Sequence, residues 1–445
     1  MKKLVLIILA VLCALTTVAQ EIIPDENTGE MAKYRRSSLY SVLMKHSSFP
    51  YAAEIDSAFM AMPMPDKFND HNLEMRSFES TAVKMKQKGK KKTEGNLQDS
   101  DNFINENGIA KKLVEKWFDR DEQYGGFDMN LIQERGFYDA SQLDIANAEQ
   151  SSRNLSVLGD AGEDLIAKTF VIINDITFVD KGENSQKVAG GLALAGMLAS
   201  QITGDDSYAA IGKLAAKVTN EIDGFTVNIT SYLYKLVWNE EVAATFYQDY
   251  WFQNGTQDDA KKVFFDNSDI FKVEYVGQTT TSAANLATKS FAKKSKGEQM
   301  LKVCARAVDK SIVELQREYD EFKVNVPIYK ISDDARTVEV QIGLKEGINE
   351  KSQFEVLMPV EGEDGKIKYE KIGMIQPMKG KIWDNRFGAL EEALDLLEDE
   401  DKKAKDKDAA NIEAASLTST TFKVLSGGNR IVPGCLVREV TIKRG

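Results

Sequence analysis

The chain has 445 residues, of which 42% are hydrophobic and 28% charged, and its formal net charge is -12 at pH 7. This length is sufficient for about two or three domains with cores of their own. The acidic excess repels phosphate backbones, so nucleic acid is not expected as a partner. With only two histidines, His46 and His71, the sequence gives little support to catalytic triads or His-bound zinc.

The first residues have the pattern of a secretory signal peptide, which we assign to residues 1–19. Two lysines precede an unbroken apolar run, Leu4 to Leu15, and the small residue Ala19 closes the segment. A basic start, a short apolar stretch and a small-residue cleavage site define such a peptide, and the run is too short for a permanent span. We therefore expect an exported chain that begins near Gln20, without a transmembrane helix, in the periplasm or at the outer-membrane periphery.

After the signal peptide the chain keeps two cysteines, Cys304 and Cys435. Two thiols exclude a disulfide framework, although a single bridge between them stays open in an oxidising compartment. Cys304 lies in a helical apolar pattern, which favours a small buried side chain.

Residues 20–82 are predicted to form an N-terminal helical segment. The stretches 35–44 and 52–62 both place apolar residues at helical spacing, and Pro63 ends the second. Methionines recur through the segment, so its apolar surface is adaptable, and we interpret it as packing against the next domain.

Residues 83–103 are predicted to be a linker. A cluster of lysines is followed there by Gly, Asn, Gln, Asp and Ser, a composition that cannot bury itself. We expect a solvated, mobile segment, with contact to anionic lipid as the alternative, so peripheral membrane contact stays open.

Residues 104–322 are predicted to form an α+β domain. Helices are expected at 109–117, within 129–150, over 160–167 behind a capping box, and over 290–321. The stretch 169–179 is apolar on both faces and is expected in the middle of a sheet. The stretch 225–233 alternates, so one of its faces should be wet, and a third strand is expected at 271–275.

Residues 323–445 are predicted to form a small all-β domain, a barrel or a sandwich. About five or six short strands are expected, with hairpin turns at 364–365 and 426–429. Residues 388–416 are a charged insertion, a short helix followed by a solvated, partly disordered loop. One face of that helix is expected to carry Leu390, Ala393, Leu394 and Leu397. The fold class is therefore α+β: a small central sheet with helices, followed by a small barrel-like all-β domain.

The densest polar cluster, residues 65–72, could hold a metal. Asp66, Asp70 and His71 offer carboxylate and imidazole groups that suit a divalent cation. The same residue types also stabilise turns through local hydrogen bonds. Because the ligand set is incomplete, we assign no metal ligand here.

An aromatic run could line a carbohydrate or peptide surface. It comprises Tyr232, Tyr234, Trp238, Phe246, Tyr247, Tyr250, Trp251 and Phe252. Glu240, Glu241 and Asp249 lie beside it and could hydrolyse a glycoside, but their separation in space cannot be read from the sequence. The alternative is a hydrophobic core with a polar rim.

The segment Val188 to Ile202 is uncharged and rich in Gly and Ala. Small residues at this spacing allow close helix contact, so the segment could oligomerise or insert into a membrane. We favour a packed internal helix because the segment is too short for a span. No Gly-rich phosphate loop with a suitable lysine follows a strand, so no nucleotide cofactor is expected.

Parts of the sequence resemble an uncharacterised family of exported Bacteroidetes proteins. The resemblance is carried by Ala19-Gln20, by Arg36-Ser37-Ser38-Leu39-Tyr40 and by Pro65-Asp66-Lys67-Phe68-Asn69-Asp70-His71. The resemblance would cover most of the chain, and it implies an envelope location without pointing to any activity. The C-terminal region is also similar to the small β domain that closes some periplasmic envelope-assembly proteins, such as flagellar assembly protein T. That similarity is carried by Gly343 to Gly347, Phe354 to Val356 and Pro433 to Val437, and it implies a fold but no role.

These features lead to one main hypothesis and two alternatives. We expect a non-enzymatic structural or accessory subunit of a cell-envelope assembly, with envelope proteins as partners and no assigned catalytic, cofactor or metal residue. The first alternative is a soluble glycan- or peptide-binding module that uses the aromatics at 232–252, and the second is a carboxylate-dependent hydrolase. The oligomeric state stays open.

Overall fold

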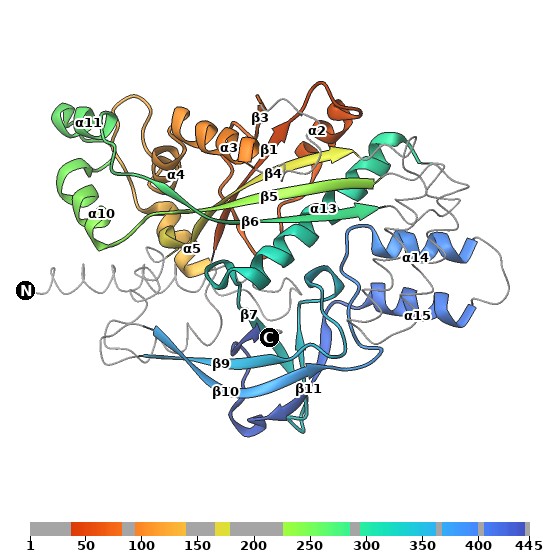
Figure 1. Cartoon of the computed structure of the whole chain (residues 1–445). Helices are drawn as coiled ribbons and strands as arrows, with labels where there is room; N and C mark the ends of the chain where they lie inside the picture. The colour runs from red at the N-terminus through yellow and green to blue at the C-terminus, as the bar shows by residue number, and fades with distance from the viewer. Residues whose placement is uncertain are drawn as a thin grey trace, which may run out of the picture.

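The computed structural model describes residues 37–81, 94–138, 165–178, 226–284, 294–361, 367–398 and 405–440. In Figure 1 these residues form a mixed sheet flanked by helices and, below it, a closed barrel, with helix α13 (Lys296–Glu318) running between the two. The predicted α+β fold class with a barrel-like C-terminal domain is confirmed. Within the described ranges, no helix combines the length and the apolar character that a membrane crossing requires.

Several predicted features lie outside the described residues. They are the signal peptide at 1–19, the stretch 83–93 of the Lys-rich linker, the capping box at 160–163, the small-residue segment 188–202 and the hairpin turn at 364–365.

The sheet has the strand order β2-β1-β4-β5-β6, and β3 also pairs with β1. Its strands are β1 (Ser38–Lys45), β2 (Asn69–Asp70), β3 (Ser77–Glu79), β4 (Thr169–Phe178), β5 (Thr226–Leu236) and β6 (Val273–Ala284). β1 runs parallel to β2, β3 and β4, whereas β4, β5 and β6 are successively antiparallel. The three strands predicted for this region are therefore present as β4, β5 and β6.

β4 lies between β1 and β5 and is buried on both faces, as its apolar run predicts. Its successive residues point alternately into two cores on opposite sides of the sheet. The wet face predicted for β5 is limited to its beginning. Asn228 is exposed, but Tyr232, four residues later on the same face, is only 1% exposed because helices cover that part of the sheet.

The prediction of an N-terminal helical segment over 20–82 is wrong for its first stretch. Residues 38–45 form β1, which pairs with β4 and is buried on both faces. Short apolar runs fit a helix and a buried strand equally well, and here the pairing partner decides. The second stretch is a helix, α2 (Ala52–Ala61), as predicted. This segment thus supplies β1, which lies beside the central strand β4, and the short strands β2 and β3 that pair with β1, so it is part of the α+β domain.

Helices cover both faces of the sheet (Figure 1). The elements on one side are α3 (Glu94–Glu106), α4 (Ile109–Trp117), α5 (Asn130–Tyr138), α10 (Glu240–Thr245), the π-helical turn η2 (Phe246–Tyr250) and α11 (Asp259–Asp266). The other side packs against α2 and α13, and α13 begins with a capping box formed by Ser295 and Glu298. Residues 94–103, placed by the prediction in the linker 83–103, belong to α3 instead, and Phe103 is buried in the core.

The barrel closes in the strand order β10-β11-β8-β7-β12-β9, with every pair antiparallel. Its strands are β7 (Val326–Ile331), β8 (Thr337–Val340), β9 (Phe354–Glu361), β10 (Ile367–Pro377), β11 (Thr420–Ser426) and β12 (Leu436–Glu439). The described residues also contain short 3-10 helical turns, η1 (Ile166–Lys168), η3 (Asp320–Phe322), η4 (Leu344–Glu346) and η5 (Gly428–Arg430). Inward residues of all six strands form a core of their own.

The hairpin predicted at 426–429 is not a hairpin. β11 pairs with β8 and β10, whereas β12 pairs with β7 and β9, so the connection joins strands that are not neighbours. Gly427 makes the connection possible with a left-handed backbone (φ 83°) and a close approach to the carbonyl oxygen of Ile372. A residue with a Cβ would collide there.

The described residues of the charged insertion 388–416 form two helices, α14 (Ala389–Glu398) and α15 (Lys405–Ser416), so residues 405–416 of the predicted loop are helical. The apolar face predicted for α14 is wrong for Leu390 and Leu394, which are exposed, and right for Ala393, which is buried together with Ala389 and Glu392. The side chain of Leu397 lies outside the described residues. The buried side of α14 includes the carboxylate of Glu392, which accepts a hydrogen bond from Arg306 of α13.

Candidate functional site

Asp66, Asp70 and His71 do not form a metal site. The side chain of Asp66 is 84% exposed and lies 3.3 Å from Lys345. Asp70 accepts a hydrogen bond from the backbone N–H of Asn72 at 2.8 Å, and His71 is fully buried. Nowhere in the described ranges do three His, Cys, Asp or Glu side chains gather so that they could hold a metal ion. The turn-stabilising alternative describes Asp70 correctly.

Both ring nitrogens of His71 are occupied. Nε2 lies 3.0 Å from the carbonyl oxygen of Leu113 on α4, and Nδ1 lies 3.1 Å from the guanidinium of Arg135 on α5. Because Arg135 can only donate, Nδ1 accepts and Nε2 donates, which is the neutral form of the ring. Burial, and then the charge of Arg135, lower the pKa of His71 well below its usual value. His71 therefore ties two helices to the edge of the sheet and is not available as a base.

The aromatic run at 232–252 packs mainly as a core. Five of its members, Tyr232, Tyr234, Phe246, Tyr250 and Phe252, are exposed by 8% or less. Phe246 lies among further rings, with its centroid 4.3 Å from that of Phe118 and 5.0 Å from that of Phe127. The half-buried rings Trp238, Tyr247 and Trp251 pack against this core. The three neighbouring acids, Glu240, Glu241 and Asp249, are exposed.

Cys304 and Cys435 are buried free thiols. Cys304 lies on α13 in the core beneath the sheet, whereas Cys435 lies in the barrel core, so the bridge that the sequence left open is not formed. Burial raises the pKa of the Cys304 thiol to about 12. A thiol in this state is unreactive, in agreement with the predicted small buried side chain.

A polar group that the sequence patterns did not reveal lies at the carboxyl ends of β1 and β4. His46 follows β1, and its Nε2 lies 2.7 Å from Oδ1 of Asp175 on β4. Asn96 of α3 donates a hydrogen bond to the other carboxylate oxygen at 2.6 Å. His46 and Asp175 are both buried. Ligands of open sheets bind at the carboxyl ends of parallel strands, so this group is the candidate site for chemistry.

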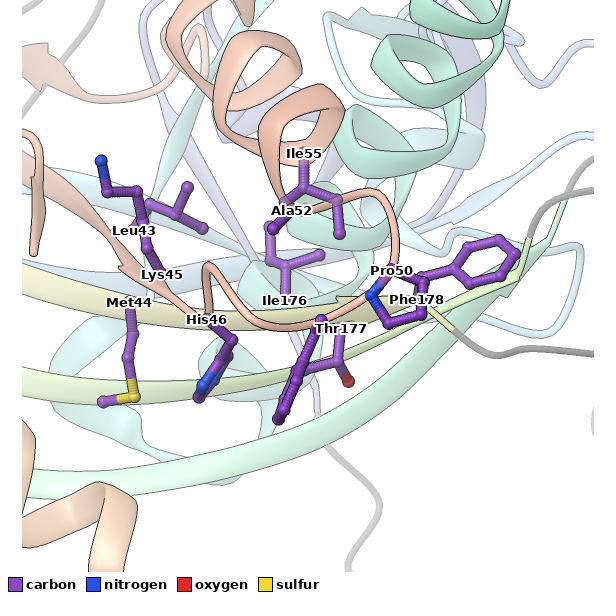
Figure 2. Close-up of a pocket in the computed structure, with 11 residues that line it drawn as sticks. Leu43, Met44, Lys45, His46, Pro50, Ala52, Ile55, Ile176, Thr177 and Phe178 are labelled. Atoms are coloured by element: carbon purple, nitrogen blue, oxygen red, sulfur yellow. The ribbon is translucent and has the colours of Figure 1, made fainter. Parts of the chain in front are cut away.

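The cavity beside His46 is very small. Figure 2 shows it under the loop that follows β1, with Pro50, Ala52 and Phe178 around it. The space that the centre of a water molecule can reach measures about 10 Å³, which is roughly the room of one water molecule. Sites for small-molecule ligands usually offer about 300 Å³ or more. The cavity therefore admits a water molecule but no organic substrate.

The chemistry open to His46 is correspondingly limited. A carboxylate that fixes an imidazole is one half of a general-base system. The neighbouring hydroxyl, Ser47 Oγ, donates instead to Glu79 at 2.6 Å, and Glu79 also accepts from the backbone N–H of Ser47 at 2.8 Å. The pair of His46 and Asp175 thus fastens the turn after β1 to β4. The signal in the sequence was the polar pair Asn174-Asp175 inside an apolar strand, because buried polar groups need partners.

A row of ion pairs joins α13 to the C-terminal domain. Glu392 of α14 accepts a hydrogen bond from Arg306 at 2.5 Å and lies 3.2 Å from Lys302. The carbonyl oxygens of Phe387 and Gly388 accept from the same two basic side chains. Burial acts to raise the pKa of Glu392, but the charges of Arg306 and Lys302 hold it below its usual value.

A second group of charges surrounds η4 near the middle of α13. Lys345 lies 3.7 Å from Asp309 of α13 and 3.3 Å from Asp66, while Glu346 pairs with Lys67. Burial raises the pKa of Asp309 to about 6, although Lys345 opposes that shift. The carboxyl of Asp309 is therefore the titratable part of this junction near neutral pH.

A third contact lies near the end of α13. Arg317 lies 3.5 Å from Glu439 of β12 and donates to the carbonyl oxygen of Gly347 at 2.9 Å. The first half, the middle and the end of α13 are thus each attached to the barrel domain or its inserted helices. We call these three sets of contacts the α13 junction.

No protein-family model matches the chain, and a search of curated proteins found no match.

Proposed function

We propose that the chain is a non-enzymatic accessory subunit of a cell-envelope assembly, exported to the periplasm or the outer-membrane periphery. The signal-peptide pattern of residues 1–19 supports export. The observation that carries the proposal is the α13 junction, because its three sets of contacts favour one orientation of the two domains. A subunit that presents surfaces to its partners benefits from such a fixed arrangement, whereas an enzyme that closes over a substrate needs a hinge.

The two histidines, the described residues best suited to acid–base catalysis, make contacts that stabilise the fold, which supports the same proposal. His71 is neutral and held between two helices. His46 is held by Asp175 beside a space for one water molecule. Both arrangements fit side chains that stabilise the fold, which supports a non-enzymatic role.

The two alternatives have less support. A glycan- or peptide-binding module would use the aromatics at 232–252, of which Trp238, Tyr247 and Trp251 reach the surface only in part. A carboxylate-dependent hydrolase needs two carboxyl groups with separated pKa values in a cleft that a substrate can enter. The raised pKa of Asp309 belongs to a buried junction with Lys345, which gives no such cleft.

The test is to tag the chromosomal copy, crosslink intact cells, fractionate the envelope and identify the proteins recovered with the chain by quantitative mass spectrometry. We expect a defined set of envelope proteins. The variant Glu392→Gln removes the carboxylate that faces Lys302 and Arg306 and should reduce recovery of that set. Glu391→Gln is the matched control, because Glu391 is the preceding residue of the same helix and its side chain is 57% exposed.

Recovery of the tagged chain alone, as a partner-free monomer in the soluble periplasmic fraction, would overturn the proposed function. Equal recovery of partners by Glu392→Gln and by the wild type would show that the rigid junction is not what the assembly requires. A set of partners that depends on Glu392 and not on Glu391 would support both steps.

A further inference from the structure

Strand β6 forms one edge of the sheet. Among the described strands it pairs with β5 alone, so one side of its backbone has no strand beside it. Residues 276–284 of β6 contain no charged residue and no proline, and three of them are threonines, which favour strands. Edge strands usually carry lysine or proline, because an unprotected edge pairs with strands of other molecules. The edge of β6 therefore needs protection from elsewhere in the fold.

Helix α13, which packs against β6, supplies a first contact to this edge (Figure 1). Tyr319 is the C-terminal cap of α13. Its hydroxyl accepts a hydrogen bond from the backbone N–H of Gln278 at 3.1 Å and donates one to the carbonyl oxygen of Gln278 at 3.3 Å. In an antiparallel strand the N–H and C=O of one residue point to the same side. Tyr319 thus occupies both edge groups of Gln278.

A second contact lies four residues further along the same edge. Nζ of Lys310, also on α13, donates a hydrogen bond to the carbonyl oxygen of Ser282 at 3.1 Å. Every second residue of a strand points its backbone groups to the same side, so Gln278, Thr280 and Ser282 share the edge that faces away from β5. The two contacts lie on either side of Thr280. A strand that paired with this edge would have to displace both of them.

Gly277 makes room for the first contact. A Cβ at this position would lie 2.0 Å from Cζ of Tyr319, so only glycine lets the phenol ring approach β6 this closely. Glycine inside a strand weakens it and often marks the close approach of another group. An aromatic ring that covers a strand glycine is also a known way to stabilise an edge. The pair of Gly277 and Tyr319 fits this arrangement.

We propose that Tyr319 and Lys310 close the edge of β6 against pairing with β6 of a second copy of this chain. A second copy fits because two antiparallel strands centred on Thr280 would place Gln278 opposite Ser282 and would bring no like charges together. Pairs of threonine and serine across antiparallel strands are favourable. The two contacts from α13 are thus an intramolecular block on self-association, and this inference does not depend on the proposed function.

The test measures self-association of the purified protein by sedimentation velocity over a range of concentrations. The double variant Tyr319→Ala/Lys310→Ala clears both contacts from the edge and should self-associate at least tenfold more tightly than the wild type. Adding Thr280→Lys to this variant brings two new lysines opposite each other in the paired strands. Self-association should then return to the wild-type level, because like charges directly opposite each other destabilise the pair.

The matched control is Tyr275→Ala/Lys323→Ala, which removes a tyrosine and a lysine that do not hold the edge. Tyr275 lies on β6, but its hydroxyl donates to the side chain of Gln278 at 3.1 Å and not to the backbone. Lys323 pairs with Asp320 in η3. This control should self-associate as the wild type does.

A second variant keeps the test decisive if the alanine variant loses its cooperative urea transition. Tyr319→Phe/Lys310→Met removes the same hydrogen bonds but keeps the ring and the length of the lysine side chain, and it should shift self-association in the same direction. The proposal is overturned if the folded variant associates no more than the wild type, or if Thr280→Lys does not reverse the effect. Because no envelope protein takes part, either result leaves the proposed function to its own test.

Discussion

Asp309 on α13 and Lys345 in η4 face each other across the α13 junction, with Oδ1 of the aspartate 3.7 Å from Nζ of the lysine. An opposite charge at this distance favours the ionised carboxylate, but burial of Asp309 outweighs it and raises its pKa from the ordinary 3.8 to about 6. Glu346 and Asp66 add repulsion from the same side, and Lys67 adds a weaker attraction. Asp309 thus gives the junction a dependence on pH.

Replacing Asp309 by asparagine should stabilise the protein at neutral pH. The folded state holds the proton of Asp309 more tightly than the unfolded state, so the stability that this group contributes is present below about pH 4 and is lost as the pH rises through about 6. A shift of about two pKa units corresponds to about 3 kcal/mol. We therefore expect Asp309→Asn to raise the free energy of unfolding by up to that amount at pH 7.5 and to leave it nearly unchanged at pH 4.

Urea unfolding of both proteins at the two pH values measures this difference. The control is Asp66→Asn, because Asp66 also faces Lys345 but its side chain is 84% exposed, and it should change stability little at either pH. An Asp309→Asn variant that is less stable than the wild type at pH 7.5 would contradict the assigned direction of the shift.

Glu392 should contribute more to stability than its neighbour Glu391. Glu392→Gln takes away the buried negative charge that faces the buried Lys302 and the partly buried Arg306, and breaking one partner of a buried ion pair costs on the order of 3 kcal/mol. Glu391 pairs with Lys294 near the surface, where such pairs contribute about 1 kcal/mol or less. Urea unfolding of the two single variants gives the comparison, and equal losses would mean that the buried carboxylate has no special role.

An element could be predicted from the sequence where its own pattern of apolar residues fits only one kind of secondary structure. β4 was placed correctly in the middle of the sheet because its apolar run fits burial on both faces. β1 was predicted as a helix, since an apolar run of its length fits both periodicities until its pairing with β4 is known. Local pattern alone cannot resolve such a segment.

The missed side-chain groups share a different cause. His46 and Asp175 are 129 positions apart in the sequence, and Arg306 and Glu392 are 86 positions apart. Each of these contacts forms between two elements that are distant in the sequence. The periodicity of residues within one element therefore cannot predict it. The same separation explains why Leu390 is wrongly assigned to the buried face of α14: it looks like a core residue until the cations of α13 are found opposite Glu392.

Cys304 and Cys435 should be unreactive in the native protein. Burial raises the pKa of Cys304 to about 12 and also raises that of Cys435, so little thiolate is present at pH 8. We expect no modification by iodoacetamide under native conditions and complete modification of both residues in urea without a reductant. Mass spectrometry of the labelled chain reads out the result. A requirement for reductant would mean that the two thiols form a bridge.

The last prediction concerns Gly427, where the chain leaves β11. A Cβ at this position would lie 2.1 Å from the carbonyl oxygen of Ile372 and would need the left-handed backbone, with φ at 83°. We expect Gly427→Ala to lower the stability of the barrel by on the order of 3 kcal/mol or more, because backbone strain and a collision with the backbone of β10 add together.

Gly255→Ala separates these two contributions. Gly255 has almost the same backbone angle, with φ at 81°, but no atom lies within 4 Å of its added Cβ. Its substitution should therefore cost only the strain of the left-handed conformation, about 1–2 kcal/mol. Thermal and urea unfolding of the two variants measure the difference between them. If both lost the same stability, the close approach of Gly427 to β10 would not be what requires glycine, and the route assigned to the chain between β11 and β12 would have to change.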